Sequence, residues 1–112
     1  MKKVEAVFRP DRLEAVKEAI IALGHAGLTD YDVKGHGIQK GLTQKWRGQE
    51  YCVDLIPKVL VTVVVHDHEV DDVIDAIAST ARTGMIGDGK IFVSPVEEVV
   101  RIRTGELGAE AV

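Results

Sequence analysis

The turn over residues 84–90 reads Gly-Met-Ile-Gly-Asp-Gly-Lys, and its residue types suit anion binding. It matches G-x-x-x-x-G-K, the first part of the P-loop pattern. However, Ile91 stands where Ser or Thr would hold magnesium, and the turn joins a predicted helix to a strand, the reverse of the P-loop order. Glycines still let successive backbone N–H groups converge on an anion, and Lys90 adds a cation. Either a phosphate site or a plain helix-to-strand turn fits these residues.

Two further segments have spacings relevant to nucleotides. On an extended segment, Arg101 and Arg103 would point two guanidinium groups the same way, which suits a polyphosphate. Two solvated charges near a chain end fit the same residues. The segment Gly35–Gly41 resembles a dinucleotide fingerprint, but its spacing is Gly-x-Gly-x-x-x-Gly and no helix is predicted after it. It therefore favours a hinge with exposed backbone N–H groups over a Rossmann site.

The segment between Gly37 and Pro57 has no sustained period of 2 or 3.6 until about Tyr51. A structureless loop of that length in a small domain is either functional or a tolerated insertion. Trp46, Arg47 and Tyr51 are residue types favoured at interface hot spots. We therefore interpret residues 38–56 as a long flexible loop that binds a partner.

Catalytic and metal-ligating patterns are weak. His66 and His68 form an H-x-H pair, but no carboxylate or cysteine set completes a zinc site, so we interpret them as surface or capping residues. His25 fits a cation at a helix end. Cys52 has no sequence partner that marks it as a nucleophile, and no Ser-His-Asp or carboxylate pair is apparent.

The hydrophobic pattern predicts six elements that position these residues. In order, they are a strand over 4–8, a helix from Pro10 to about Leu23, a strand over 29–34, a strand over 59–65, a helix capped by Asp67 that ends at Thr83-Gly84, and a strand over 91–93. Residues 96–102 are predicted to be extended again, and the tail 104–112 to be mobile when free. This order predicts one α+β domain over 1–112: a ferredoxin-like βαββαβ sandwich with both helices on one face of an antiparallel sheet.

The strand Val59–Val65 bears on assembly. With helices on one face, the other face of the sheet would meet water, and its strands should alternate apolar and polar residues. This strand is apolar at every position except Thr62, so both of its faces favour burial. We expect the open face to pack against other copies of the chain in a closed homo-oligomer. A β-rich core with no bare face is the alternative, although 112 residues leave little chain to cover it.

Composition narrows the class of protein. The net charge of −4 argues against a nucleic-acid partner. The longest nearly unbroken apolar run, Val59–Val65, has seven residues including Thr62, whereas a membrane span needs about 20. The N-terminal residues lack the apolar core of a signal peptide. The single cysteine excludes an internal disulfide, and the expected location is a reduced, cytoplasmic compartment.

Three longer motifs resemble the PII nitrogen-signalling family. They are Thr-Gly-x-Ile-Gly-Asp-Gly-Lys-Ile-Phe at 83–92, Val-x-Arg-Ile-Arg-Thr-Gly-Glu at 99–106, and Gln-Lys-Gly…Arg-Gly-x-Glu-Tyr…Pro-Lys-Val at 39–59. The resemblance covers nearly the whole chain. It implies a homotrimer that senses nitrogen and energy status and is not an enzyme. ATP or ADP would bind in the clefts between subunits, and 2-oxoglutarate would bind through a Mg²⁺ ion on the ATP.

The resemblance also implies ligand residues. The nucleotide would contact Thr29, Gly35, His36, Gly37, Ile38, Thr62, Val64, Gly87, Asp88, Gly89, Lys90, Arg101 and Arg103. Thr29 would reach the base from the adjoining subunit. Gln39 would ligate magnesium, and 2-oxoglutarate would be held by Gln39, Lys40, Gly41, Lys58 and Gly87.

Partners follow from the same resemblance. Arg47 would enter the channel of an Amt-type ammonium transporter, and Tyr51 is where some members are uridylylated or adenylylated. The chain would regulate that transporter or a nitrogen-metabolism enzyme, and would reach the inner face of the membrane only through the transporter. Ile38 and Thr62 stand where the family commonly has Arg and an acidic residue, which removes one potential phosphate contact and alters a hydrogen bond to the base.

Two other classes of function remain open on the residues. A small phosphotransferase or ATPase of ferredoxin-like fold would need a base or phosphate-accepting group near Lys90, and His36 is the only candidate by proximity to the site. A structural or metal-handling trimer of the same fold would not bind nucleotide.

Overall fold

The computed structural model describes residues 1–36, 42–46, 49–53 and 55–112, with side chains described for 1–36 and 55–112. The elements are β1 (Lys2–Phe8), α1 (Leu13–Ala22), β2 (Leu28–Gly35), β3 (Leu42–Trp46), β4 (Gln49–Val53), β5 (Ile56–Val65), α2 (Val70–Ala81) and β6 (Lys90–Pro95). Short 3₁₀ helices cover Pro10–Arg12, Asp67–Glu69 and Gly108–Ala111. In the described part of the chain, no helix is long and apolar enough to cross a membrane.

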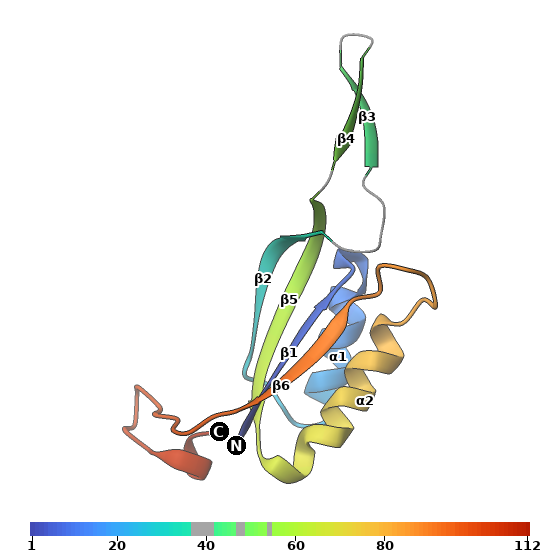
Figure 1. Cartoon of the computed structure of the whole chain (residues 1–112). Helices are drawn as coiled ribbons and strands as arrows, with labels where there is room; N and C mark the ends of the chain where they lie inside the picture. The colour runs from blue at the N-terminus through green and yellow to red at the C-terminus, as the bar shows by residue number, and fades with distance from the viewer. Residues whose placement is uncertain (37–41, 47–48, 54) are drawn as a thin grey trace.

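Four of the strands form one antiparallel sheet in the order β2-β5-β1-β6. Both helices cover the same face of this sheet (Figure 1). The central pair, β1 and β5, aligns Val4 with Val63 and Phe8 with Val59. The ferredoxin-like α+β prediction is therefore confirmed.

The core lies between the helices and the inner face of the sheet. Alternate residues of β1 and β5 point inward, and the helices meet them with residues at spacings of three and four. The buried set is Val4, Ala6, Phe8, Val16, Ile20, Val59, Val61, Val63, Val65, Val73, Ile77 and Ala81. Helix α1 ends at Ala22, one residue before the predicted end, and Leu23 is 42% exposed.

The outer face of the sheet is open in the single chain and mixes apolar residues with the ion pair Lys3–Glu5 of β1. Leu60, Thr62 and Val64 of β5 are only half-buried there. Tyr31 of β2 and Phe92 of β6 are each more than half exposed on strands that flank the central pair. Exposed apolar residues on this face were expected, because apolar and polar residues do not alternate along Val59–Val65. The homo-oligomer that would cover it stays a prediction.

The segment predicted as a loop over 38–56 contains a two-stranded sheet, so the prediction of a structureless loop is wrong for its described residues. β3 and β4 pair antiparallel, with Thr43 opposite Cys52 and Lys45 opposite Glu50. The hairpin extends away from the four-stranded sheet (Figure 1). Its strands have five residues each, too few for a period to stand out from the sequence.

β5 begins at Ile56, three residues before the predicted start. Its first residues pair only with β2, with Pro57 opposite Lys34, because the pairing with β1 begins at Val59. A proline is tolerated there because the strand has a neighbour on one side only. Lys58 consequently belongs to the sheet and not to the loop.

The C-terminal predictions also need correction. β6 ends at Pro95, and residues 96–102 form no strand; Val100 makes only an isolated bridge to Leu107. The Gly105 N–H bonds the Arg101 carbonyl, which closes a turn over Arg103. Arg101 and Arg103 therefore do not sit on an extended segment, and their predicted parallel geometry is wrong. The tail 104–112 folds back through this bridge and ends in the 3₁₀ helix Gly108–Ala111.

The start of α2 differs in one detail. His66, and not Asp67, is the N-cap residue of the 3₁₀ helix Asp67–Glu69 that leads into α2, and the Glu69 carboxylate accepts a hydrogen bond from the His66 N–H at 3.1 Å. Asp67 instead pairs with the amino group of Met1 at 2.8 Å.

Candidate functional site

The turn between α2 and β6 is held from within by Asp88. Its carboxylate accepts hydrogen bonds from the Thr83 N–H at 2.8 Å, the Gly84 N–H at 2.8 Å and the Thr83 hydroxyl. These bonds, the Thr83 hydroxyl first, hold the pKa of Asp88 well below its usual range. The Asp88 side chain is therefore committed to the turn, so the predicted contact of this residue with phosphate would come from its backbone.

Two cations from other elements also bind the turn. Arg9, directly after β1, donates from Nε to the Asp88 carboxylate at 3.3 Å and from Nη2 to the Ile86 carbonyl at 2.7 Å. Lys58 of β5 donates from Nζ to the Gly87 carbonyl at 2.6 Å. Lys58 is only 9% exposed, and burial, followed by the nearby Arg9 charge, lowers its pKa. The turn thus has a defined shape in the single chain.

Gly89 packs directly against the backbone of β1. Its φ is +100°, and a Cβ atom placed there would lie 1.7 Å from the Val7 carbonyl oxygen. Only glycine fits such an approach in this conformation. The contact fixes where β6 begins and therefore where Lys90 points.

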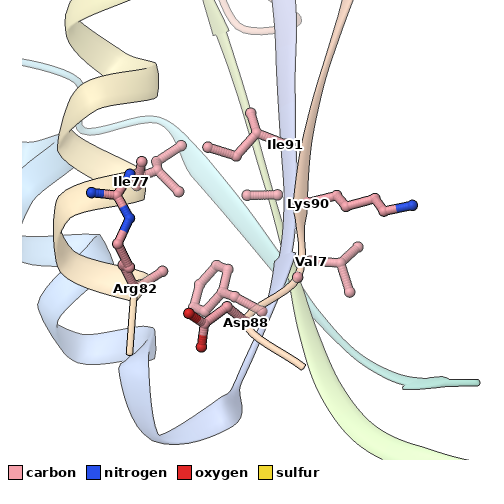
Figure 2. Close-up of a pocket in the computed structure, with 11 residues that line it drawn as sticks. Val7, Ile77, Arg82, Asp88, Lys90 and Ile91 are labelled. Carbon is pink, nitrogen blue, oxygen red and sulfur yellow. The ribbon is translucent and has the colours of Figure 1, made fainter. Parts of the chain in front are cut away.

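Lys90 lies on the outer side of the sheet. Figure 2 shows the Lys90 and Val7 side chains pointing away from α2, whereas Ile77, Arg82 and Ile91 lie on the helix side. The cavity drawn there, of about 260 Å³, lies between the end of α2 and the sheet. Lys90 is exposed and its charge faces the other, open side.

A larger cavity of about 540 Å³ lies beside the turn on that open side. Residues from β1, β2, β5, β6 and the turn line it together. They are Val7, Gly35, His36, Ile56, Lys58, Met85, Ile86, Gly87, Asp88, Gly89, Lys90 and Phe92. Seven residues predicted to bind ligand are in this set, from three segments far apart in the sequence: Gly35, His36, Lys58, Gly87, Asp88, Gly89 and Lys90.

The remaining described candidates lie elsewhere. Thr29 pairs with Thr62 across β2 and β5, and the Thr62 hydroxyl lies 3.5 Å from the Glu5 carboxylate. Val64 and Arg101 line a third cavity of about 580 Å³, formed with the residues that follow α1 and with the C-terminal residues. The Arg101 guanidinium contacts the Glu106 carboxylate at 3.3 Å. This second group would meet the base and the phosphates from another side.

The segment that carries Arg101 and Arg103 is separated from the turn by the length of β6. The turn over 84–90 lies at one end of this strand, and the segment 97–112 lies beyond the other end (Figure 1). The six residues of β6 span about 17 Å. One chain therefore does not bring Arg101 and Arg103 to the cavity that holds Lys90.

Several predicted residues lie outside the described part of the chain: Gly37, Ile38, Gln39, Lys40, Gly41 and Arg47. Tyr51 lies on β4 opposite Gln44. Among the described residues, no group of three or more His, Cys, Asp or Glu could hold a metal ion. The magnesium assignment therefore depends on Gln39 alone.

Sequence reasoning missed Arg9 and Thr83, which shape the turn. Arg9 is 79 residues from Asp88, and no local pattern signals so distant a contact. A signal for Thr83 was available, because a hydroxyl residue at the start of a turn commonly bonds a side chain within it.

The depressed pKa of Asp88 predicts an acid dependence of stability. A carboxyl whose pKa is lower in the folded state stabilises the fold above its usual pKa of about 3.8, and this contribution is lost as pH falls through the window below that value. We expect Asp88→Asn to lack this part of the loss. Thermal unfolding of both proteins between pH 6 and about 3 would measure it; parallel curves would contradict the assignment.

Comparison with known proteins identifies relatives over the whole chain. The sequence pattern of the family described as "Nitrogen regulatory protein P-II" matches residues 1–106. The chain is 56% identical over 112 residues to "Nitrogen regulatory protein P-II" of Microchaete diplosiphon, and 55% identical to the protein of the same description from Azospirillum brasilense, with 100% of both chains covered in each case. It is 52% identical to "Nitrogen regulatory protein P-II 2" of Methanothermobacter thermautotrophicus, covering 100% of this chain and 97% of that one.

Proposed function

Because this chain belongs to the nitrogen regulatory protein P-II family, we propose that it is a signalling protein that binds ATP or ADP in clefts between the subunits of a homotrimer. The prediction that it is not an enzyme agrees with the family, whose members are named as regulators. Nitrogen signalling is the role that the family supports. The ligands and the assembly are our proposal.

One observation carries the nucleotide proposal. Seven predicted ligand residues line the 540 Å³ cavity, while Arg101 lies beyond the far end of β6. A second copy that packs on the open outer face would bring its own Thr29, Thr62 and Val64 toward such a cavity, and its C-terminal arginines with them. A cleft between copies thus explains why the site is divided within one chain.

The residues of the cavity fit a nucleotide phosphate. Gly87 and Gly89 both have positive φ, Gly89 has no room for a side chain, and Lys58 and Lys90 supply cations from two strands. Charge-assisted hydrogen bonds to phosphate oxygens are stronger than neutral ones. Arg101 and Arg103 of the neighbouring copy would add planar donors for the same phosphates.

The second effector would be 2-oxoglutarate, held by Gln39, Lys40, Gly41, Lys58 and Gly87, with Gln39 on the magnesium ion. Lys58 and Gly87 are already joined by a hydrogen bond at the cavity wall, so the buried cation stands where a carboxylate could approach. The other three residues begin the segment that leads to the hairpin β3–β4. Ligand binding there would bias the conformation of that segment.

The position of the hairpin would then depend on which ligands are bound, and it would decide whether a partner binds. Arg47 lies between β3 and β4 in sequence, and Tyr51 lies on β4. We propose that ADP favours a hairpin position that engages an Amt-type ammonium transporter or a nitrogen-metabolism enzyme, and that ATP with 2-oxoglutarate disfavours it. The protein would be cytoplasmic and meet the membrane only through the transporter.

Titration calorimetry of Mg-ATP into the protein, with and without 2-oxoglutarate, tests this function. Linked binding predicts a tightening of ATP affinity by roughly fivefold or more when 2-oxoglutarate is present. Lys17→Ala, an exposed change on α1, is the control and should behave as the unaltered protein. Absence of ATP binding would reject the nucleotide site, and equal affinities would reject the coupling.

A further inference from the structure

We propose that Arg9 is a positioning residue for the phosphate-binding turn: it neutralises the Asp88 carboxylate and fixes the spacing between Ile86 and Asp88 before ligand arrives. The inference rests on the proposed nucleotide function. It concerns a residue that neither the sequence motifs nor the resemblance assigns to the nucleotide.

The Arg9 guanidinium holds the turn at two points. One guanidinium contacts the turn at two places, the Ile86 carbonyl at 2.7 Å and the Asp88 carboxylate at 3.3 Å. A planar fork holds two acceptors at a fixed separation, which a single ammonium group does not. Arg9 follows Phe8, which is buried in the core, so the base of the Arg9 side chain is anchored. The contact therefore transmits the rigidity of β1 to the turn.

The Arg9 guanidinium also acts electrostatically. Asp88 lies in the middle of a segment proposed to bind phosphate, and two like charges at close range repel each other. The carboxylate receives three hydrogen bonds from Thr83 and Gly84, but these supply no net charge. Arg9 is the cation that pairs with it. Both side chains are about three-quarters covered, which limits screening by solvent.

Arg9 does not line the cavity in which the phosphate is proposed to bind. Asp88, Gly89 and Lys90 line the 540 Å³ cavity, whereas Arg9 is absent from its wall. Arg9 therefore acts on a phosphate through the turn. Loss of Arg9 would both free the Ile86–Asp88 spacing and remove the cation that contacts the Asp88 carboxylate, which leaves only the charge of Lys58 near it.

The repulsive part of this effect grows with ligand charge. Removing the Arg9 charge should weaken ADP binding more than AMP binding, because ADP carries more negative charge toward the turn. If Arg9 had a purely structural role, its loss would weaken the binding of ADP and of AMP by the same factor, because both depend equally on the folded turn. The ratio of the two affinities therefore distinguishes the roles.

The experiment measures ADP and AMP affinities by calorimetry for the unaltered protein, Arg9→Gln, Arg9→Lys and Arg9→Gln/Asp88→Asn. We expect Arg9→Gln to weaken ADP binding by about tenfold or more and AMP binding by clearly less. Arg9→Lys keeps the charge and loses the fork, so its loss should be intermediate. The double variant should recover part of the ADP affinity because the carboxylate left without its Arg9 partner is gone.

Arg82→Gln is the matched control. It removes an arginine charge near the same turn, on the α2 side shown in Figure 2, and should change neither affinity by more than about twofold. If Arg9→Gln does not fold, Arg9→Lys tests the fork alone: it keeps the charge, so it should weaken ADP and AMP binding by similar factors, and unchanged affinities would overturn the role of Arg9.

The outcomes separate the two proposals. An unaltered protein that binds no ADP overturns the nucleotide function and this inference with it. An unaltered protein that binds ADP, beside an Arg9→Gln variant with unchanged affinity or with equal losses for ADP and AMP, overturns the role of Arg9 alone.

Discussion

Replacing Gly89 by alanine should lower the free energy of unfolding by about 3 kcal/mol or more and abolish nucleotide binding. The added Cβ would lie 1.7 Å from the Val7 carbonyl oxygen and 2.7 Å from its carbon, at a φ of +100°. Since these are backbone atoms of a central strand, the turn has to move away from β1, and Lys90 moves with it. Chemical denaturation and calorimetry with ADP would measure the two effects.

Gly84→Ala is the matched control for this prediction. Gly84 also has a positive φ, +87°, but no atom lies within 4 Å of the position of its Cβ. It should therefore show only the conformational cost of about 1 kcal/mol for alanine in the left-handed region. Equal effects of the two substitutions would show that the approach of Gly89 to Val7 does not decide the position of the turn.

Arg101→Ala should weaken ADP and ATP binding by roughly 100-fold, because a charge-assisted contact with phosphate is lost. In the single chain the guanidinium contacts the Glu106 carboxylate at 3.3 Å and the Glu110 carbonyl at 3.5 Å. These contacts are long and half exposed, so a polyphosphate can replace them. Calorimetry with each nucleotide would measure the loss.

Glu106→Gln separates the two possible roles of this pair. It removes the carboxylate that competes for Arg101, so nucleotide affinity should be equal to or higher than that of the unaltered protein. If Glu106→Gln weakens binding as strongly as Arg101→Ala, the pair serves the structure of the tail and not the binding of phosphate.

The order of elements was predictable because it depends on local periodicity. Val16 and Ile20 are buried in α1, Val73 and Ile77 are buried in α2, and the inward residues of β5 from Val59 to Val65 are buried, as the spacings indicate. The hairpin β3–β4 was missed because five-residue strands give almost no periodic signal. The segment 96–102 was wrongly predicted as extended because it is shaped by single contacts, such as the bridge Val100–Leu107, and not by a repeating pattern.

The sequence predicted which residues belong to the candidate site, but not which of them contact one another. Gly87, Gly89 and Lys90 lie together because they are adjacent in sequence, and the resemblance added Gly35, His36 and Lys58, which the fold then brings to the same cavity. Asp88 was predicted among the residues of the turn that contact the nucleotide, but the bonds of its carboxylate to Thr83 and Gly84 were not foreseen. Its pairing with Arg9 depends on packing between β1 and the turn, which no local sequence pattern contains.

Mixed assembly tests most directly whether two copies complete one site. Lys90→Ala and Arg101→Ala chains, carrying different affinity tags, are co-expressed and the trimers that contain both are isolated. Neither parent should bind ADP appreciably, whereas each mixed trimer should bind about one ADP, in the single cleft where an intact turn meets an intact Arg101. Mixed trimers that bind no ADP, or chains that remain monomeric, would contradict a site shared between subunits.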